Sequence, residues 1–283
     1  MLRIAIQSKG RLYDETMTLL EESGIRLNKS RRTLLQSAVD FPVEVLFLRD
    51  DDIPQSVANG VADAGIVGEN EYVEKGQEAE LIRRLGFSRC RLSLAIPKEA
   101  AYEGLEWFEG KTVATSYPVI LNRFLEEKGI HAALHEISGS VEIAPGIGLA
   151  DAIFDIVSSG STLVGNQLKE VEVVMKSEAL LIASRSLTAG KREVLDKMLF
   201  RFAAVQEAAG RKYVLLNAPR TQLAEITKLL PGMKSPTVTP LADEGWVSVQ
   251  SVITETHFWE IIGQLKTLGA EGILVIPIEK MIR

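Results

Sequence analysis

Short apolar segments alternate with amphipathic ones along the first part of the chain, and this alternation limits the possible folds most. Residues 2–6, 43–48 and 62–68 are apolar and partly β-branched, which predicts buried strands. Residues 13–23 and 50–59 between them have the spacing and end signals of helices. The order strand–helix–strand–helix–strand predicts a parallel, doubly wound α/β sheet.

Composition narrows the class of protein. The 283 residues, 46% hydrophobic and 25% charged, are enough for two domains with a large core, so no disulfide or metal is needed to hold the fold. A net charge of −6 argues against a nucleic-acid-binding surface. No apolar run reaches the roughly 20 residues of a membrane span, no signal peptide precedes residues 2–6, and the single Cys90 suits a reducing compartment. We therefore expect a cytoplasmic protein without a nucleic-acid or membrane partner.

A turn of small residues follows the predicted strand at 153–157. The turn consists of Ser158, Ser159, Gly160, Ser161 and Thr162. Helix-compatible residues resume at Leu163, so backbone N–H groups, hydroxyls and a helix N-terminus gather around one point, as they do at phosphate sites. Gly160 would let the backbone approach a ligand closely. A serine-rich turn without a ligand is an equally weighted alternative.

Two carboxylates, Asp151 and Asp155, precede this turn. They would repel a phosphate, but they can accept hydrogen bonds from sugar hydroxyls or hold a metal ion. Phosphate donors next to sugar acceptors suit a phosphorylated ribose.

A basic loop follows the first predicted strand. Lys9, Gly10 and Arg11 lie between that strand and the next helix, at the edge of the sheet where open α/β folds bind ligands. The two cations could clamp an anion, with Gly10 as the flexible point. Two solvated surface cations are the alternative.

The next strand ends in a cation followed by three acids. Arg49 is a candidate anion ligand, and Asp50, Asp51 and Asp52 could hold Mg²⁺. An acidic N-cap with Pro54 in the first helical turn explains the three acids more simply, and we favour that interpretation.

After the predicted strand at 91–96, ended by Pro97, we expect the chain to cross into a second lobe. Strands are predicted there at 111–115 and 132–137. Tyr117 follows the first of them and could stack on a base, or be an ordinary half-buried loop tyrosine. His131 and His135 lack a third ligand, so we expect no zinc site, and Cys90 is predicted to be a small core residue.

The last part of the chain has a different order of predicted strands and helices. A long helix at 191–213 with an apolar face is followed by strands and helices in the order βαββαβ, which predicts a ferredoxin-like module. Thr237 and Ala270 are plausible ligand contacts there, although the sequence alone favours ordinary turn chemistry at both positions.

Many separated segments together resemble one enzyme family, ATP phosphoribosyltransferase in its long form. The segments are residues 7–11, 49–54, 65–70, 91–95, 114–118, 139–142, 148–153, 155–162, 236–237, 258–260 and 276–281. The resemblance implies transfer of the phosphoribosyl group of phosphoribosyl pyrophosphate (PRPP) to N1 of the adenine of ATP, with release of pyrophosphate, as the first step of histidine biosynthesis.

The resemblance also implies an architecture. A catalytic region, residues 1–211, would have two lobes shaped like a periplasmic solute-binding protein. Lobe I would comprise about 1–92 and 177–211, and lobe II about 93–176. Residues 212–283 would form a regulatory domain that binds histidine as a feedback inhibitor, in a homo-oligomer that moves between dimer and hexamer.

By the same resemblance, Asp155, Arg11 and Lys9 are the expected catalytic residues. Asp151 and the stretch 155–162 would hold PRPP. The residues expected near the nucleotide or the pyrophosphate are Lys9, Gly10, Arg11, Arg49, Glu69 and Tyr117. The roles of Glu69 and Glu142 stay unassigned, and Mg²⁺ would be held mainly by the substrate phosphates.

The implied chemistry needs positioning and electrostatic stabilisation more than a strong acid or base, because pyrophosphate neutralised by Mg²⁺ is already a good leaving group. The sequence agrees with this, since it contains no nucleophile–histidine constellation. Two other functions fit parts of the pattern: a solute-binding protein, and a catalytically silent subunit that senses a ligand. The phosphate turn and the tail module argue against the first, and the intact stretch 155–162 argues against the second.

Overall fold

The computed structural model describes residues 1–28, 34–76 and 78–283, which divide into two compact units. The first unit contains Met1–Thr18 and Ile25–Leu195, and the second contains Leu19–Gly24 and Asp196–Arg283. None of the helices among these residues has the length and apolar character that a membrane-crossing helix requires.

One sheet of the first unit organises a part of the chain that we call lobe I. Its strands are β1 (Leu2–Gln7), β2 (Leu35–Ser37), β3 (Val43–Leu48), β4 (Ala64–Gly68), β5 (Glu80–Arg84) and β11 (Ala179–Ala183). Their order in the described chain is β2-β3-β1-β4-β11-β5. The predicted parallel arrangement holds for β3, β1 and β4. The pairs β2–β3, β4–β11 and β11–β5 are antiparallel, so the sheet is mixed.

The helices of lobe I differ from the sequence predictions at their ends. They are α1 (Arg11–Glu22), the 3₁₀ turn η1 (Asp50–Asp52), α2 (Ile53–Ala58) and α3 (Glu69–Glu74). Because α1 begins at Arg11, this residue belongs to the first helical turn and not to the predicted loop. Asp52 occupies the N-cap position of α2 and Pro54 its first turn, as predicted, but the Asp52 side chain makes no capping hydrogen bond there.

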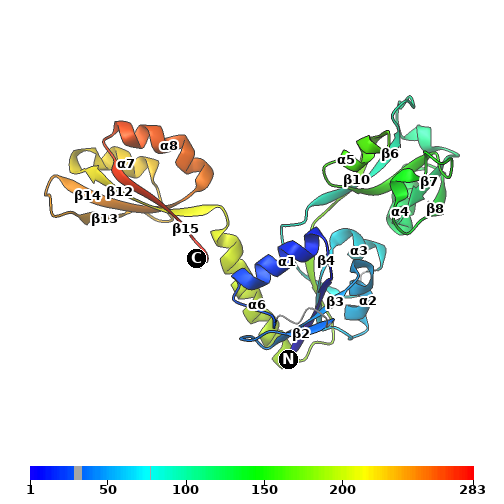
Figure 1. Cartoon of the computed structure of the whole chain (residues 1–283), viewed down its shortest axis with the longest axis horizontal. Helices are drawn as coiled ribbons and strands as arrows, with labels where there is room; N and C mark the ends of the chain where they lie inside the picture. Colours follow the sequence, from blue (N-terminus) through cyan, green and yellow to red (C-terminus); the bar gives the residue numbers. More distant parts are fainter. Residues whose placement is uncertain (29–33, 77) are drawn as a thin grey trace. The chain divides into compact units, whose positions relative to one another are not determined.

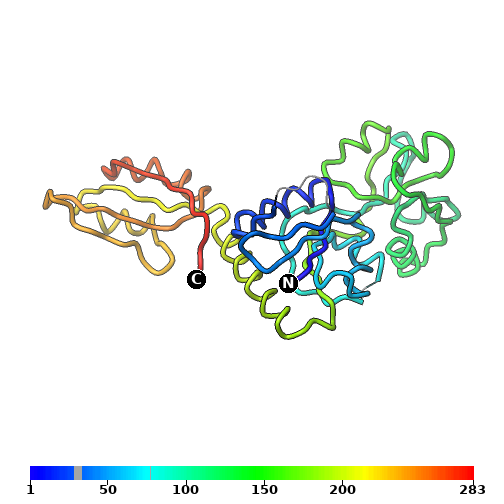
Figure 2. The backbone as a smooth tube through the Cα atoms, turned by 60° about the horizontal axis from the view of Figure 1, so that its bottom comes forward, coloured from blue at the N-terminus to red at the C-terminus, as the bar shows by residue number. Residues whose placement is uncertain are grey.

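The second sheet of this unit organises lobe II. Its strands are β6 (Cys90–Pro97), β7 (Thr112–Thr115), β8 (Ala133–Glu136), β9 (Ala152–Val157) and β10 (Leu168–Ser177), in the described order β10-β6-β9-β7-β8. The chain leaves lobe I before β6 and returns to it as β11 (Figure 2). Strand β11 runs antiparallel to both of its neighbours, β4 and β5.

Helices cover both faces of the lobe II sheet. They are η2 (Leu105–Phe108), α4 (Pro118–Lys128), η3 (Val141–Ile143) and α5 (Ser161–Gly165). On one face Leu92 and Phe154 pack with Leu121 of α4. On the other, Ala95 and Ile153 pack with residues of η3 and α5. The central strands β6 and β9 are therefore buried on both sides, as their apolar sequences require.

The tail of the second unit has the predicted ferredoxin-like arrangement. Its elements are β12 (Arg211–Pro219), η4 (Arg220–Gln222), α7 (Leu223–Leu229), β13 (Thr237–Pro240), β14 (Trp246–Thr254), α8 (Glu255–Thr267) and β15 (Glu271–Pro277). In the described sheet, β14 separates β12 from β13, and β12 separates β14 from β15. Helices α7 and α8 cover one face of this sheet (Figure 1).

The long helix before the tail is shorter than predicted. Helix α6 (Ala189–Ala208) ends at Ala208, not at Tyr213, and β12 already begins at Arg211. The turn between them contains Gly210 with φ +70°, a left-handed conformation that ends helices and favours glycine.

A buried carboxylate joins the two lobes. Glu74, at the end of α3 in lobe I, accepts hydrogen bonds from the backbone N–H groups of Val119 and Ile120, both at 2.9 Å. These N–H groups belong to the first turn of α4 in lobe II, where a helix has no partners of its own for them. A negative charge at this end is also favoured by the helix dipole.

We predict that Glu74→Ala destabilises the first unit by about 1–3 kcal/mol, because the buried N–H group of Ile120 and the part-buried N–H group of Val119 lose their acceptor. Urea unfolding followed by circular dichroism measures this. Glu127→Ala, at an exposed position of the same α4, is the control. Equal unfolding free energies for the two variants would contradict a capping role.

Candidate active site

The phosphate turn predicted from the sequence lies between β9 and α5. Strand β9 ends at Val157, and α5 begins at Ser161. Gly160 precedes α5 with φ +80°, a backbone conformation that L side chains rarely adopt. The hydroxyls of Ser159 and Ser161 lie 3.0 Å apart. The strand, the small-residue turn and the helix start are therefore present in the predicted order.

Arg11 reaches this turn from the other lobe. Its Nη1 donates to the Ser158 hydroxyl at 2.8 Å, and its Nη2 donates to the carbonyl of Arg89 at 2.9 Å. Lys9 and Gly10 lie just before it in the turn between β1 and α1, where Gly10 has φ +93°. The structure thus brings two segments that are 147 residues apart in the sequence into one place.

A second guanidinium group contacts the same turn. Arg91, near the start of β6, donates from Nη1 to the Ser158 carbonyl at 3.2 Å. Sequence reasoning assigned no role to Arg91. In the sequence, Arg91 is the first residue of the segment 91–95, one of the segments that resemble the family, and this position could have pointed to it.

Asp155 lies on β9 close to the turn. Burial raises the pKa of its carboxyl group to about 6; the hydrogen bond from the Ile156 N–H, at 2.7 Å, opposes this rise, and the charge of Glu142 adds to it. The carboxylates of Asp155 and Glu142 repel each other. A cation, or a sugar hydroxyl that donates a hydrogen bond, would reduce this repulsion.

Asp151 is not brought to the turn. It precedes β9, while the turn follows the strand, and seven residues of extended chain span roughly 20 Å. Its carboxylate accepts from the Thr112 N–H at 2.9 Å and lies 3.9 Å from Lys111 Nζ. These contacts connect the starts of β7 and β9, so Asp151 has a local structural partner at the far end of the strand.

Tyr117 is buried, which neither sequence interpretation anticipated. Only 6% of it is exposed, and its ring belongs to the core between the lobe II sheet and α4. Its hydroxyl accepts from Asn70 Nδ2 of lobe I at 3.1 Å. Burial raises the pKa of this hydroxyl, so it stays protonated. A ring enclosed in this way offers no open face on which a base could stack.

The remaining predicted residues of lobe I lie at strand ends. Arg49 is exposed just after β3 and precedes η1. Glu69, the first residue of α3, accepts from Arg84 Nη1 at 2.6 Å, and Glu178 lies 3.3 Å from the same nitrogen. The Glu69 carboxylate is therefore bound in an ion pair.

Metal ligands do not converge in the described chain. No group of three or more His, Cys, Asp or Glu side chains there has the geometry of a metal site. The distance from His131 Nδ1 to Glu109 Oε1 is 3.3 Å. Cys90 is half-buried, and burial raises the pKa of its thiol. The predicted acids Asp50, Asp51 and Asp52 do not form a chelating cluster: Asp50 instead accepts from Gln7 Nε2 at 3.3 Å.

Sequence comparison supplies the family. The family model described as ATP phosphoribosyltransferase matches residues 49–204, and the model described as HisG, C-terminal domain, matches residues 208–280. The chain belongs to the ATP phosphoribosyltransferase family.

Relatives and solved structures agree with this assignment. The ATP phosphoribosyltransferases of Parabacteroides distasonis and Cytophaga hutchinsonii are 77% and 56% identical, in alignments that cover 100% of this chain and 100% and 99% of theirs. An ATP phosphoribosyl transferase (HisG:HisZ) complex from Thermotoga maritima matches with a TM-score of 0.62 and 30% identity, over 73% of this chain and 97% of that one.

A histidine kinase sensor domain similar to periplasmic binding proteins matches with a TM-score of 0.50 and 13% identity, over 73% of this chain and 90% of that one. This likeness concerns the fold alone and confirms the predicted two-lobed shape.

The predicted reaction is confirmed by the family. The phosphoribosyl group of PRPP is transferred to N1 of the adenine of ATP, pyrophosphate is released, and the reaction is the first step of histidine biosynthesis. The alternative that the chain is a solute-binding protein is therefore wrong.

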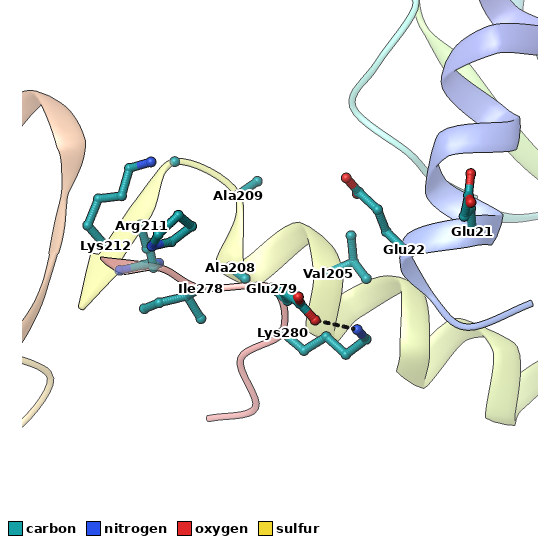
Figure 3. Close-up of a pocket in the computed structure, with 12 residues that line it drawn as sticks. Glu21, Glu22, Val205, Ala208, Ala209, Arg211, Lys212, Ile278, Glu279 and Lys280 are labelled. Atoms are coloured by element: carbon teal, nitrogen blue, oxygen red, sulfur yellow. Dashed lines mark hydrogen bonds and ion pairs between the residues drawn. The ribbon is translucent and has the colours of Figure 1, made fainter. Parts of the chain in front are cut away.

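The second unit contains a separate cavity of about 480 Å³. It lies around the Gly210 turn, with Glu21 and Glu22 from the end of α1 on one side and Arg211 and Lys212 on the other (Figure 3). Among the described residues that line it, none was predicted to bind a ligand. Thr237 lines a different cavity, of about 440 Å³, whereas Ala270 is buried in the tail core and does not line that cavity.

Glu71 makes the stability of the first unit depend on pH. Burial raises its pKa from 4.5 to about 7, so the folded protein keeps a proton that the unfolded chain releases. Stability is then full below about pH 4.5 and falls as the pH rises to about 7, by on the order of 2–3 kcal/mol. We predict that Glu71→Gln, which does not ionise, reduces the slope of the unfolding free energy across this window in urea titrations at several pH values; Asp155, whose pKa is also raised, keeps part of the slope.

Glu127→Gln at an exposed position serves as the control and should follow the wild-type slope. A Glu71→Gln protein with the wild-type slope between pH 4.5 and 7 would show that another group causes the pH dependence.

Proposed function

We propose that PRPP binds at the turn formed by residues 158–162, with its 5′-phosphate on the turn and its ribose hydroxyls on Asp155. One observation carries this proposal: Arg11 from lobe I donates to Ser158 of the turn in lobe II at 2.8 Å. A phosphate at the turn would therefore meet backbone N–H groups and hydroxyls from one lobe and a cation from the other. Lys9 and Arg49 are proposed to face the pyrophosphate or the ATP phosphates.

The proposed mechanism depends on placement and charge. As the bond from C1 of the ribose to pyrophosphate breaks, C1 becomes positively charged. Asp155, ionised above its pKa of about 6, would hold the ribose hydroxyls and stabilise that charge. Arg11 would hold the phosphate end, so that C1 faces N1 of the adenine. No side chain needs to attack the ribose, which agrees with the absence of a nucleophile–histidine pair from the sequence.

The acids at the site also fit a role for Mg²⁺. Glu142 and Asp155 lie close enough for their charges to interact, and two carboxylates suit a cation that keeps most of its ligands from water and phosphate. We propose that Mg²⁺ is held mainly by the substrate phosphates, with these two carboxylates as its protein partners. The ion would supply charge neutralisation of the leaving pyrophosphate.

We predict that two variants affect the reaction differently. Thr162→Ala removes a hydroxyl from the turn, and its KM for PRPP should rise about tenfold, as expected for one lost hydrogen bond to a charged group. Asp155→Asn keeps the shape but removes the charge, so kcat should fall more than the affinity for ATP does. Pyrophosphate release measured at varied PRPP and varied ATP separates the two effects.

Thr267→Ala, at an exposed position of α8 in the tail, is the matched control and should behave like the wild type. A wild-type KM for PRPP in Thr162→Ala would remove the phosphate from this turn. Unchanged turnover in Asp155→Asn would leave that residue without a catalytic role.

We further propose that residues 1–211 form the catalytic region and residues 212–283 a regulatory domain that binds histidine, in a homo-oligomer that moves between dimer and hexamer. A cytoplasmic location remains a prediction from the sequence.

The ferredoxin-like fold of the tail and its match to the C-terminal family domain support a separate role for the tail. The cavity at Thr237 supports a ligand site, because Tyr213, Ser235 and Gln250 also line it and supply polar atoms. Ala270 is not included in the proposed site, because it is buried in the tail core and does not line the cavity. A larger side chain there would disrupt the core.

We predict that Thr237→Val reduces inhibition by histidine while turnover without histidine stays within about twofold, because the change removes only a hydroxyl of an otherwise similar shape. Thr239→Val is the control, since Thr239 is exposed on the same strand and does not line the cavity. Equal inhibition of both variants, measured as turnover against histidine concentration, would place the inhibitor elsewhere.

A further inference from the structure

A cluster of charged and polar side chains supports the phosphate turn from behind. Arg91 donates to both oxygens of Glu170, from Nε at 2.5 Å and from Nη2 at 2.6 Å. The buried Ser93 donates its hydroxyl to Glu170 Oε1 at 2.6 Å. Glu170 thus receives three short hydrogen bonds, two of them from a planar guanidinium whose orientation they determine.

These side chains share one face of the lobe II sheet. Arg91 and Ser93 are two residues apart on β6, so they point to the same side. Glu170 comes from the neighbouring strand β10, and Ser93 pairs in register with Asp155 of β9. The cluster therefore reaches from the outermost strand of the sheet to the acid proposed to hold the ribose.

The remaining nitrogen atom of the Arg91 guanidinium, Nη1, contacts the turn. With Nε and Nη2 bound to Glu170, Nη1 is left to donate to the Ser158 carbonyl at 3.2 Å. That carbonyl is the first of the turn, directly after β9. Its position sets the direction in which the following N–H groups of the turn point. Arg11 holds the hydroxyl of the same residue, so Ser158 is fixed at both its backbone and its side chain.

The opposite charges of Arg91 and Glu170 also indicate the role of this ion pair. Glu170 lies close enough to Arg91 to neutralise much of its charge, and Arg91 lowers the pKa of Glu170, which keeps it ionised. A neutralised guanidinium attracts a phosphate weakly. Its contribution is therefore geometric. Arg11 differs, because among the residues that the structure describes its guanidinium donates to neutral oxygen atoms, those of Ser158 and Arg89.

We propose that Glu170 is a positioning residue for PRPP: it orients Arg91, which holds the Ser158 carbonyl and sets the phosphate turn in its binding geometry. The inference rests on the proposed phosphate site. Neither Glu170 nor Arg91 needs to touch the substrate.

The test is a comparison of Glu170→Gln and Arg91→Lys with the wild type in the full-length enzyme. Glutamine has a similar shape but only one oxygen, so it cannot accept both nitrogens of Arg91; lysine keeps the charge but loses the fork. The KM for PRPP should rise about tenfold in each, while the KM for ATP and the melting temperature stay near the wild-type values. The double variant should be no worse than Arg91→Lys alone, because both changes break one connection.

Glu172→Gln is the matched control. Glu172 lies on the same strand and accepts a hydrogen bond from the Tyr102 hydroxyl at 3.3 Å. Its KM for PRPP should stay at the wild-type value. A wild-type KM for PRPP in Glu170→Gln would overturn the proposal, and so would an equal rise of both KM values together with a lower melting temperature, which indicates a purely structural role.

Thr162→Ala separates this inference from the proposed function. If Thr162→Ala weakens PRPP binding and neither Glu170→Gln nor Arg91→Lys does, the phosphate site stands and the positioning role is wrong. If none of the three variants changes the KM for PRPP, the phosphate site itself is misplaced. Should Glu170→Gln fail to fold, Arg91→Lys still decides, because a wild-type KM for PRPP in that variant overturns the proposal.

Discussion

The candidate site depends on the hydrogen bonds that Arg11 and Arg91 make to Ser158. The chain has a net charge of −6, yet its substrates carry many phosphates, so cations must be gathered locally. Arg11 comes from the first turn of α1 and Arg91 from β6, which belong to different lobes. One residue of the turn thereby takes donors from two directions, and the turn gains a defined geometry that its small residues alone would not have.

Other bonds between the lobes involve neutral or negative groups. Glu74 caps α4 across the boundary, and Asn70 donates to the Tyr117 hydroxyl from the same short helix α3. Asn70 also accepts from Ser177, the last residue of β10 before the chain returns to lobe I. These partners are buried, so breaking them leaves polar groups unsatisfied.

The elements followed from periodicity, whereas the contacts between distant residues did not. Strand β9 and the turn after it were predicted, because an apolar run followed by small residues has a local physical meaning. The placement of Asp151 failed for a simple reason: adjacency in sequence becomes distance along an extended strand. The burial of Tyr117 depends on α3 of the other lobe, and the pairing of Arg91 with Glu170 on strand register, neither of which a local pattern contains. The edge strands β2 and β5 were missed because they are short and largely exposed.

The acids at the site connect substrate binding to protonation. Burial raises the pKa of Asp155 to about 6, so a proton occupies it more readily than in water. A cation or hydroxyl donor that binds ionised Asp155 competes with protonation of this group, and linkage requires that such binding lowers its pKa. The same burial that makes the ionised carboxylate costly makes its interaction with a positive ribose stronger, since fewer water molecules screen it. The raised pKa is therefore a consequence of the low-dielectric surroundings that electrostatic stabilisation of the breaking bond requires.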